Sequence, residues 1–350
     1  MSYDAISRYQ LSPGAFIGLT VTEKGEHILI PDLLGLRPLY FTDTFVSDRF
    51  LPLVDSLKTK QNLVFRNDSV AHFLKFGYSE PGYSLIEGIF RIKPGEGIII
   101  KDGKFERVKI NPPDLRLLFG NLTKNENASE IIKKIQARLA EILKSIDVPA
   151  SADLTGGNDS RVLVSMISPE STILEASYSH NSKTNGEATT GKKVAELTGI
   201  KYYFTSAPEN VSLNDLYSAF EYIDGCGNII SAFRHRKMQE ERAERGIKLS
   251  ISGNGGTFYK DSWWLQDFPF YKKKKASLKK LIELRICPSS ITESLFSKNI
   301  LNSAETITTR HSQRLGALSK GLKNTEAYDQ IYYFEKSSSV LAPFIHGSLI

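Results

Sequence analysis

The sequence predicts a mixed α/β protein in which a domain built on a parallel sheet follows a smaller, antiparallel β-rich domain. Three observations lead to this prediction. Short apolar runs between residues 14 and 105 are separated by turn residues, which is typical of antiparallel sheets. Beyond residue 148, strand-like runs alternate with helical patterns, which indicates βαβ units. Between these regions, Pro112–Pro113 and the polar stretch 121–127 form a predicted linker.

The first domain, residues 1–115, contains apolar runs with the length of strands. They are Phe16–Val21, His27–Ile30, Pro38–Phe41 and Gly97–Ile100. Turn residues stand where the chain must reverse, at 23–25, 93–95 and 101–103, and each of these turns ends in glycine. We therefore expect strands joined by tight turns, as in an antiparallel sheet.

The second domain, residues 125–350, begins with a predicted helix, because apolar residues recur at helical spacing between Ile131 and Ile146. Strands are expected next at 148–154, 172–178, 200–204 and 247–252, and helices from residue 160 and at 186–197, 213–223 and 232–245. We interpret Arg234–Lys237 as the solvated side of the last helix, with contact to an anionic substrate as the alternative. In sheets of this kind, ligands bind at the carboxyl ends of the strands.

Composition and charge are those of an ordinary globular protein. Hydrophobic residues make up 41% of the chain and charged residues 24%, which excludes a disordered or collagen-like protein. The net charge of +6 is densest at Lys272–Lys275, which we interpret as a solvated run, with an anion-binding patch as the alternative. No stretch reaches the roughly 18 apolar residues of a membrane span, so we expect a cytoplasmic protein without a membrane partner. Cys226 and Cys287 lack CxxC spacing and are expected to be reduced thiols.

One motif in the sequence has the residue types of an anion-binding loop. The segment Thr155–Ser160 (TGGNDS) lies where a strand should end and a helix begin. Its two glycines allow backbone amides to approach an anion, its hydroxyls add donors, and the helix start adds unpaired amides and a positive dipole. A polyphosphate fits such a loop, and Asp159 would then need a divalent cation such as Mg²⁺ between it and the phosphates. The alternative is an ordinary Gly-Gly turn capped by Asp at the start of a helix.

This segment resembles the SGGxDS pyrophosphate loop of the asparagine synthetase-like ATP-pyrophosphatases, with Thr155 in place of the first serine. Further blocks resemble the same family in the same order. Asp32–Phe41 (DLLGLRPLYF) is similar to the D-x-x-G-x-[RK]-P-L-Y-[YF] block of the family's amino-terminal domain. The other blocks are Leu85–Gly95, which closes that domain, Gly186–Gly199, the second glycine-rich loop Ser252–Gly256, and Tyr332–Ile350.

The resemblance implies a fold for each domain. The second would be an ATP-pyrophosphatase domain of the adenine nucleotide alpha hydrolase-like, Rossmann-like type. The first would be a degenerate Ntn-hydrolase-like, glutaminase-like domain. Members of this family let a carboxylate attack the α-phosphate of ATP, which releases pyrophosphate and forms an acyl-adenylate. A nitrogen nucleophile then displaces AMP.

The resemblance also implies a set of site residues. The residues that would hold the pyrophosphate and Mg²⁺ of bound ATP are Thr155, Gly156, Gly157, Asp159 and Ser160. Asp159 would be the metal ligand, and Asp159 and Ser160 would act in catalysis. The residues that would line the nucleoside are Leu154, Ser177, Ser252 and Gly253.

Three departures from the family pattern shape the expected function. The chain begins Met1-Ser2-Tyr3 instead of with the cysteine that hydrolyses glutamine, so we expect no glutaminase activity of its own. Thr257-Phe258 follow the second glycine loop where the family has an Asp-Glu pair that helps to hold magnesium, and Asp261 is a candidate substitute. The sequence ends at Ile350, where family members continue with a region that contributes a catalytic lysine.

The expected function is therefore ATP-dependent, AMP-forming amide-bond synthesis, as in a carbon–nitrogen ligase or amidotransferase. The expected partners are a small-molecule or peptide carboxylate as substrate and ammonia or an amine as donor. A homodimer and a partner subunit both stay open, and nucleic acid is not expected. The alternative is a catalytically weakened, nucleotide-binding homologue that acts as a partner subunit. A tRNA-modifying enzyme is disfavoured because the chain has no CxxC pair.

Overall fold

The computed structural model divides the chain into two compact units, which are described separately. Unit 1 comprises Met1–Asp114, Phe220–Asn228 and Lys260–Ile350, and unit 2 comprises Leu115–Ala219 and Ile229–Tyr259. Within these ranges the structure describes residues 15–32, 35–80, 82–93, 95–110, 128–167, 173–206, 210–253 and 296–321. Several predictions lie outside the described residues: those for Pro112–Pro113, 121–127, Thr257-Phe258, Asp261, Lys272–Lys275 and Tyr332–Ile350.

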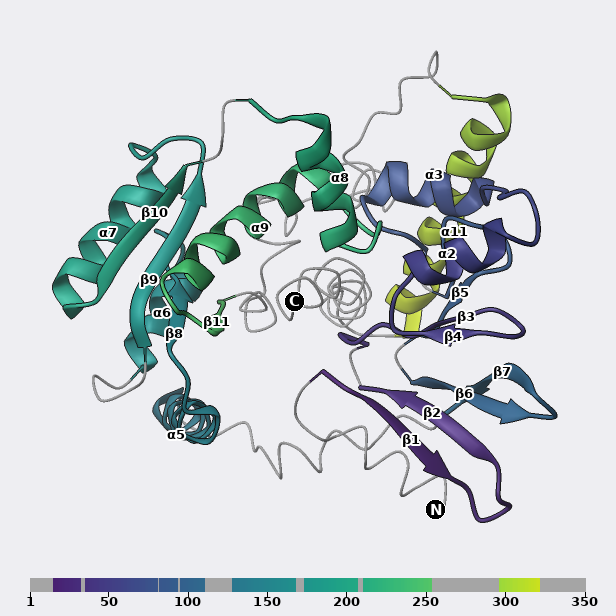
Figure 1. Cartoon of the computed structure of the whole chain (residues 1–350), viewed down its shortest axis with the longest axis horizontal. Coiled ribbons are helices and arrows are strands. Elements are labelled where there is room, and N and C mark those ends of the chain that lie inside the picture. The colour runs from purple at the N-terminus through teal and green to yellow at the C-terminus, as the bar shows by residue number, and fades with distance from the viewer. Residues whose placement is uncertain are drawn as a thin grey trace. The chain divides into compact units, whose positions relative to one another are not determined.

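Unit 1 contains two antiparallel sheets (Figure 1). The larger has the order β1-β2-β6-β7 and consists of β1 (Ile17–Val21), β2 (His27–Pro31), β6 (Glu96–Lys101) and β7 (Lys104–Lys109). The smaller has the order β4-β3-β5, with β4 (Val46–Ser47), β3 (Tyr40–Phe41) and β5 (Phe90–Arg91). Asp102 and Gly103 have φ values of 50° and 74°, which close the hairpin between β6 and β7. The predicted strands of this region and the predicted turn at 101–103 are confirmed.

Unit 1 also contains helices that the sequence analysis did not predict. They are α2 (Leu51–Lys58), α3 (Asn67–Phe76) and α11 (Lys298–Gly321), and α11 packs on α3. α2 and α3 are 8 and 10 residues long and lie in a region whose short apolar runs and turn residues favoured an antiparallel sheet. α2 covers a cluster of buried apolar side chains: Tyr40, Phe50, Leu53, Ile86 and Ile89.

A segment distant in sequence completes unit 1. Residues Phe220–Asn228 include the end of α8 (Leu213–Tyr222) and precede α9 (Ile229–Glu244). The buried Asp224 carboxylate accepts hydrogen bonds from the backbone amides of Phe50 and Leu51, the latter at 3.0 Å, at the start of α2. The Tyr40 hydroxyl lies 3.4 Å from the Cys226 sulfur. The sequence predicts this segment to be part of the second domain.

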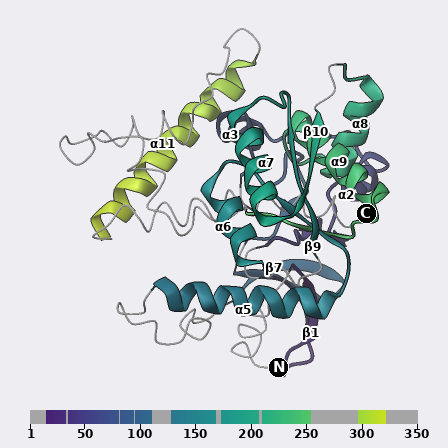
Figure 2. The same cartoon turned by 90° about the vertical axis from the view of Figure 1, so that its left-hand side faces the viewer.

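Unit 2 is a parallel sheet covered by helices (Figures 1 and 2). Its strands are β8 (Ala150–Asp153), β9 (Ile173–His180), β10 (Lys201–Ser206) and β11 (Leu249–Ile251), and they pair in parallel in the order β10-β9-β8-β11. The helices are α5 (Ala128–Ile146), α6 (Asn158–Met166), α7 (Gly186–Thr198), α8 and α9. The predicted mixed α/β class with a parallel sheet is confirmed, and so are the predicted strands and helices from α5 to β11.

The strand order creates a switch point next to β8. From β8 the chain moves outward through β9 to β10, and then returns to place β11 on the opposite side of β8. The connections that leave the carboxyl ends of β8 and β11 therefore diverge. Ligands of open parallel sheets bind at such a point.

The two faces of this sheet differ in character. The face covered by α6 and α7 is apolar, with a core of Ala152, Leu154, Val164, Ala176 and Ala195. A Cβ atom on Gly191 of α7 would lie 2.7 Å from the Leu154 carbonyl oxygen, so the close approach of α7 to the end of β8 requires glycine. The other face, toward α9, is polar and belongs to the candidate site.

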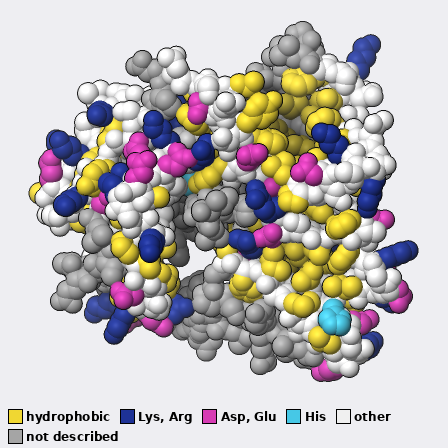
Figure 3. Space-filling model, viewed as in Figure 1, with side chains coloured by type: hydrophobic (Ala, Val, Ile, Leu, Met, Phe, Trp, Pro, Cys, Tyr) yellow, Lys and Arg dark blue, Asp and Glu magenta, His cyan; other side chains and the backbone are white. Residues whose placement is uncertain are grey.

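The surface of unit 1 carries exposed apolar side chains on its larger sheet. Leu19 and Val21 of the edge strand β1 are 63% and 44% exposed, and apolar side chains gather over this sheet in Figure 3. In the described part of the chain, no helix combines the length and the apolar character that crossing a bilayer would require.

Candidate functional site

The two glycine-containing segments singled out in the sequence meet at the switch point of unit 2. Thr155–Ser160 follows β8, and Ser252–Gly253 follows β11. A Cβ atom on Gly253 would lie 2.8 Å from the backbone nitrogen of Ser160 and 2.9 Å from the carbonyl carbon of Asp159. Only glycine allows the segment after β11 to lie this close to the start of α6. The candidate site is therefore the carboxyl edge of β8 and β11.

Two hydroxyl groups hold the first segment in its shape. The Ser160 hydroxyl oxygen accepts a hydrogen bond from the Thr155 amide at 3.1 Å and lies 3.1 Å from the Thr155 hydroxyl. The Gly157 amide donates to the Thr155 hydroxyl oxygen at 2.9 Å. Ser160 is buried. Both hydroxyls, which the sequence analysis offered as donors to an anion, make these contacts within the loop.

The amino end of α6 is suited to an anion. Gly157 occupies the N-cap position, and no side chain caps the helix there. The first amides of a helix have no partners within it, and the helix dipole adds positive potential. The Arg161 guanidinium lies at the same end, with its Nε 3.4 Å from the Gly157 carbonyl oxygen and a short contact to the Asn158 side chain. A cation at a helix amino end is unfavourable by itself, and a bound anion would offset this cost.

A second carboxylate stands beside the loop. Glu187 is in the first turn of α7, where the Asn185 side chain accepts a hydrogen bond from its amide at 2.7 Å. A Cβ atom on Gly156 would lie 3.1 Å from the Glu187 Cα and 3.3 Å from the Glu187 Oε2 atom. Gly156 therefore serves the packing of the loop on α7, and Glu187 faces the loop. Glu187 has no distinguishing signal in the sequence, because an acidic residue in the first turn of a helix is common.

The residues of this loop fit Mg²⁺ only together with a bound phosphate ligand. Within the described ranges, no group of three or more His, Cys, Asp or Glu side chains is arranged to hold a metal ion. Mg²⁺ in phosphate sites takes one or two protein carboxylates and completes its octahedron with phosphate oxygens and water. Asp159, in the first turn of α6, fits that role together with a bound polyphosphate.

Leu154 and Ser177 place their side chains in the interior. Leu154 is fully buried in the apolar core, and its amide donates to the Ser177 carbonyl oxygen at 3.0 Å. Ser177 is also fully buried, with its hydroxyl oxygen 2.9 Å from that of Ser151 and 3.2 Å from the Arg242 Nε. Any contact of these two residues with a nucleoside would therefore involve backbone atoms.

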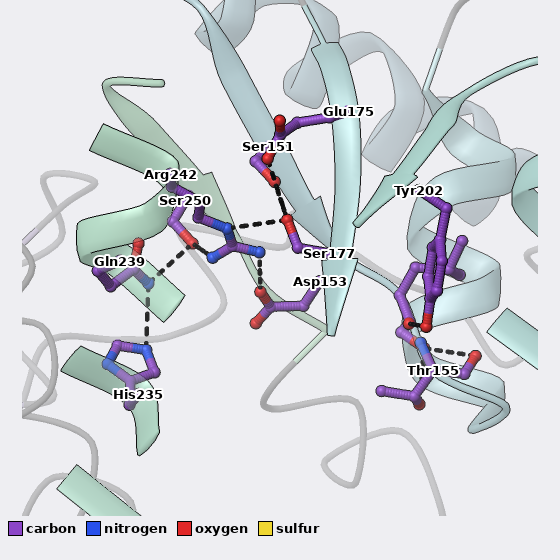
Figure 4. A network of polar contacts seen from close by, with 12 residues as sticks. Ser151, Asp153, Thr155, Glu175, Ser177, Tyr202, His235, Gln239, Arg242 and Ser250 are labelled. Carbon is purple, nitrogen blue, oxygen red and sulfur yellow. Dashed lines mark hydrogen bonds and ion pairs between the residues drawn. The ribbon is translucent and has the colours of Figure 1, made fainter. Parts of the chain in front are cut away.

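A buried arginine connects three of the strands (Figure 4). Arg242 of α9 is 1% exposed, and its Nη2 donates to Asp153 Oδ1 at 2.7 Å. Its Nη1 donates to the Ser250 hydroxyl oxygen at 2.6 Å, and its Nε donates to that of Ser177. Arg242 could not be recognised from the sequence, because an arginine in a predicted helix gives no sign of burial.

Neighbouring groups extend this network. Arg245 makes two hydrogen bonds to the buried Glu175 carboxylate, at 2.7 and 2.8 Å. Burial raises the pKa of Glu175, but the hydrogen bonds and charge of Arg245 outweigh it and hold the pKa below its usual value. The Gln239 amide lies 3.3 Å from the ring of His235, and burial lowers the pKa of His235. Each of the four residues from Arg234 to Lys237 is partly exposed, so the interpretation of this run as a solvated face stays a prediction.

Comparison with models of known protein families and with curated proteins found no match for this chain.

Proposed function

We propose that this protein binds ATP with Mg²⁺ at the switch point of unit 2 and uses it for AMP-forming amide-bond synthesis on a carboxylate substrate, as asparagine synthetase-like enzymes do. Unit 1 would then be a degenerate, Ntn-hydrolase-like domain without glutaminase activity, and the donor would be ammonia or an amine.

The observation that carries this proposal is the meeting of two glycine segments at one edge of a parallel sheet. The Gly253 backbone lies against the peptide that joins Asp159 and Ser160, and both segments start at the strands that flank the switch point. A common Gly-Gly turn needs no second glycine segment packed against it. Two backbones that approach each other at the amino end of an uncapped helix suit a ligand that is recognised by amides, such as a polyphosphate.

Each part of the loop would have a defined role. The amides at the start of α6 would bind the pyrophosphate moiety, and the Arg161 guanidinium would offset its charge. Asp159 would hold Mg²⁺, which supplies charge neutralisation when the metal is bound. Thr155 and Ser160 would keep the loop in shape through their mutual hydrogen bonds. The carboxylate substrate would attack the α-phosphate with pyrophosphate as the leaving group, and the nitrogen nucleophile would then displace AMP.

A second candidate function is a nucleotide-binding homologue without turnover. One feature of the sequence favours this second function: Thr257-Phe258 stand where the family has the Asp-Glu pair that helps to hold magnesium. Such a protein would bind ATP and act as a partner subunit. The two candidates differ in pyrophosphate release and share the same binding loop.

The test combines binding with turnover. Calorimetric titration with ATP and Mg²⁺ should give saturable binding, and incubation with ATP, Mg²⁺, ammonia and a panel of carboxylates should release pyrophosphate. Asp159→Ala should abolish this release. The matched control is Glu196→Ala, which removes a carboxylate that is 61% exposed near the end of α7. Binding without release would favour the second candidate, and absence of binding by the wild-type protein would refute both.

A further inference from the structure

The side of the parallel sheet that faces α9 is polar where such sheets are normally apolar. Parallel sheets are covered on both faces, and their strands usually consist of apolar residues. Here several polar side chains of the strands bond to α9 or to one another beneath it. They are Ser151, Asp153, Glu175, Ser177, Thr205 and Ser250. The packing of α9 on the sheet therefore relies on hydrogen bonds and ion pairs, which have strict requirements of geometry.

Arg242 alone bonds to three strands within this network. Its nitrogens reach Asp153 at the end of β8, Ser177 on β9 and Ser250 on β11 (Figure 4). Asp153 and Ser177 are register partners in the sheet, and the register partner of Ser250 is Ser151 of β8. The guanidinium is planar and its donors are fixed relative to one another. Its bonds therefore link the end of β8 to its register partner on β9 and to β11.

The same residue is coupled to the loop. Asp153 accepts the charged hydrogen bond of Arg242, and two residues later Thr155 begins the glycine segment. The Asp153 side chain is 24% exposed, whereas Arg242 is 1% exposed, so the ion pair runs from the interior toward the carboxyl edge. A change in Arg242 removes the charged donor of the partly exposed Asp153 carboxylate and one donor each from the Ser177 and Ser250 hydroxyls. The end of β8 would shift, and the loop with it.

The neighbouring ion pair of Arg245 and Glu175 provides a comparison for Arg242. It is bidentate, and Glu175 is 3% exposed. However, Glu175 lies two residues before Ser177 on β9 and is the register partner of Ser151, so it is further from the loop than Asp153. Arg245 bonds to this one strand, and the link of Glu175 to Arg242 runs through the Ser177 hydroxyl, which donates to Glu175 at 3.1 Å. The two arginines therefore have similar buried bonds but different connections to the loop.

We propose that Arg242 is a positioning residue for the phosphate-binding loop: by bonding to β8, β9 and β11, it sets the loop after β8 and the Gly253 segment in the relative position that binds the polyphosphate. The proposal rests on the proposed function for the identity of the ligand. The holding of the loop by Arg242 is a property of the free protein and can be measured without nucleotide.

The experiment compares Arg242→Met with Arg245→Met in the full chain. Thermal unfolding should show that both variants lose stability. Amide hydrogen exchange without ligand should be faster at residues 155–160 in R242M than in R245M. The affinity for ATP with Mg²⁺ should fall about tenfold or more in R242M, and by no more than about twofold in R245M. Arg242→Lys keeps the charge and one bond, so its affinity should lie between those of R242M and the wild type; it also serves if R242M does not fold.

The outcomes separate the two proposals. Equal exchange at residues 155–160 in R242M and R245M would overturn the positioning role, whatever the nucleotide result. If the wild-type protein binds no ATP, the proposed function fails, and faster exchange in R242M would still support the role of Arg242 in holding the loop. If ATP binds equally well to wild type and to folded R242M, the positioning role is refuted and the proposed ATP site is retained.

Discussion

Replacement of Gly253 by alanine tests whether the contact between the two glycine segments shapes the site. The added methyl carbon would lie 2.8 Å from the Ser160 nitrogen, 2.9 Å from the Asp159 carbonyl carbon and 3.0 Å from the Ser160 Cα. Ordinary contacts between carbon atoms begin at about 3.5 Å, so the two backbones must separate by about half an ångström or more. All three neighbours are backbone atoms and cannot rotate away. We expect a loss of about 1–3 kcal/mol in the free energy of unfolding.

The larger effect should be on binding. The atoms that must move belong to the first turn of α6, whose amides are the proposed ligands of the phosphates. We expect the affinity for ATP with Mg²⁺, measured by calorimetry, to fall by about tenfold or more in Gly253→Ala, because a misplaced binding group forfeits its contact. Gly186→Ala is the matched control, since a Cβ atom there meets nothing within 4 Å. Wild-type affinity in folded Gly253→Ala would refute the reasoning.

Two further predictions concern titrating groups. Burial raises the pKa of the Cys226 thiol to about 12; in a Cys287→Ser background at about pH 8, its alkylation should be about a thousand times slower in the native protein than in urea, and equal rates would contradict this. In the folded protein the pKa of His235 lies below its usual 6.5. As the pH falls, the His235 ring is therefore protonated in the unfolded chain before it is protonated in the folded protein, and the free energy of unfolding decreases below about pH 6.5. The low pKa of Glu175 adds a second loss below about pH 4.5. Thermal unfolding should show the first loss in the wild type and not in His235→Gln; the same loss in both would exclude His235 as its origin.

The elements of unit 2 could be predicted because their signals are local. The apolar period of α5, the alternation from β8 to β11 and the glycine loop after β8 each depend on neighbouring residues. The turn at Asp102-Gly103 was equally local, because a left-handed conformation favours these residue types. Such features form with little dependence on the rest of the chain, so a single sequence contains them.

The features that were missed depend on contacts distant in sequence. Asp224 caps the start of α2 across more than 170 residues, and no pattern near either residue indicates this. The strand order that places β11 beside β8 is also determined by tertiary contacts, since the alternation of strands and helices along the chain allows other orders. Ser177 illustrates the limit for site residues. The resemblance implies that Ser177 lines the nucleoside, but its side chain is fully buried within β9 and bonds to Ser151 and Arg242.

The polar packing of α9 bears on why the site has this form. A buried ion pair costs desolvation that its attraction only partly recovers, so apolar residues would hold α9 to the sheet at least as firmly. The opposite face of the same sheet does use apolar residues. What apolar packing does not provide is a fixed geometry, because such contacts tolerate small shifts between elements. The bonds of Arg242 tolerate much less, and they hold the strands from which the two glycine segments leave. The polar network therefore lies where the proposed phosphate site, which would bind its ligand through backbone amides, needs its strands held most precisely.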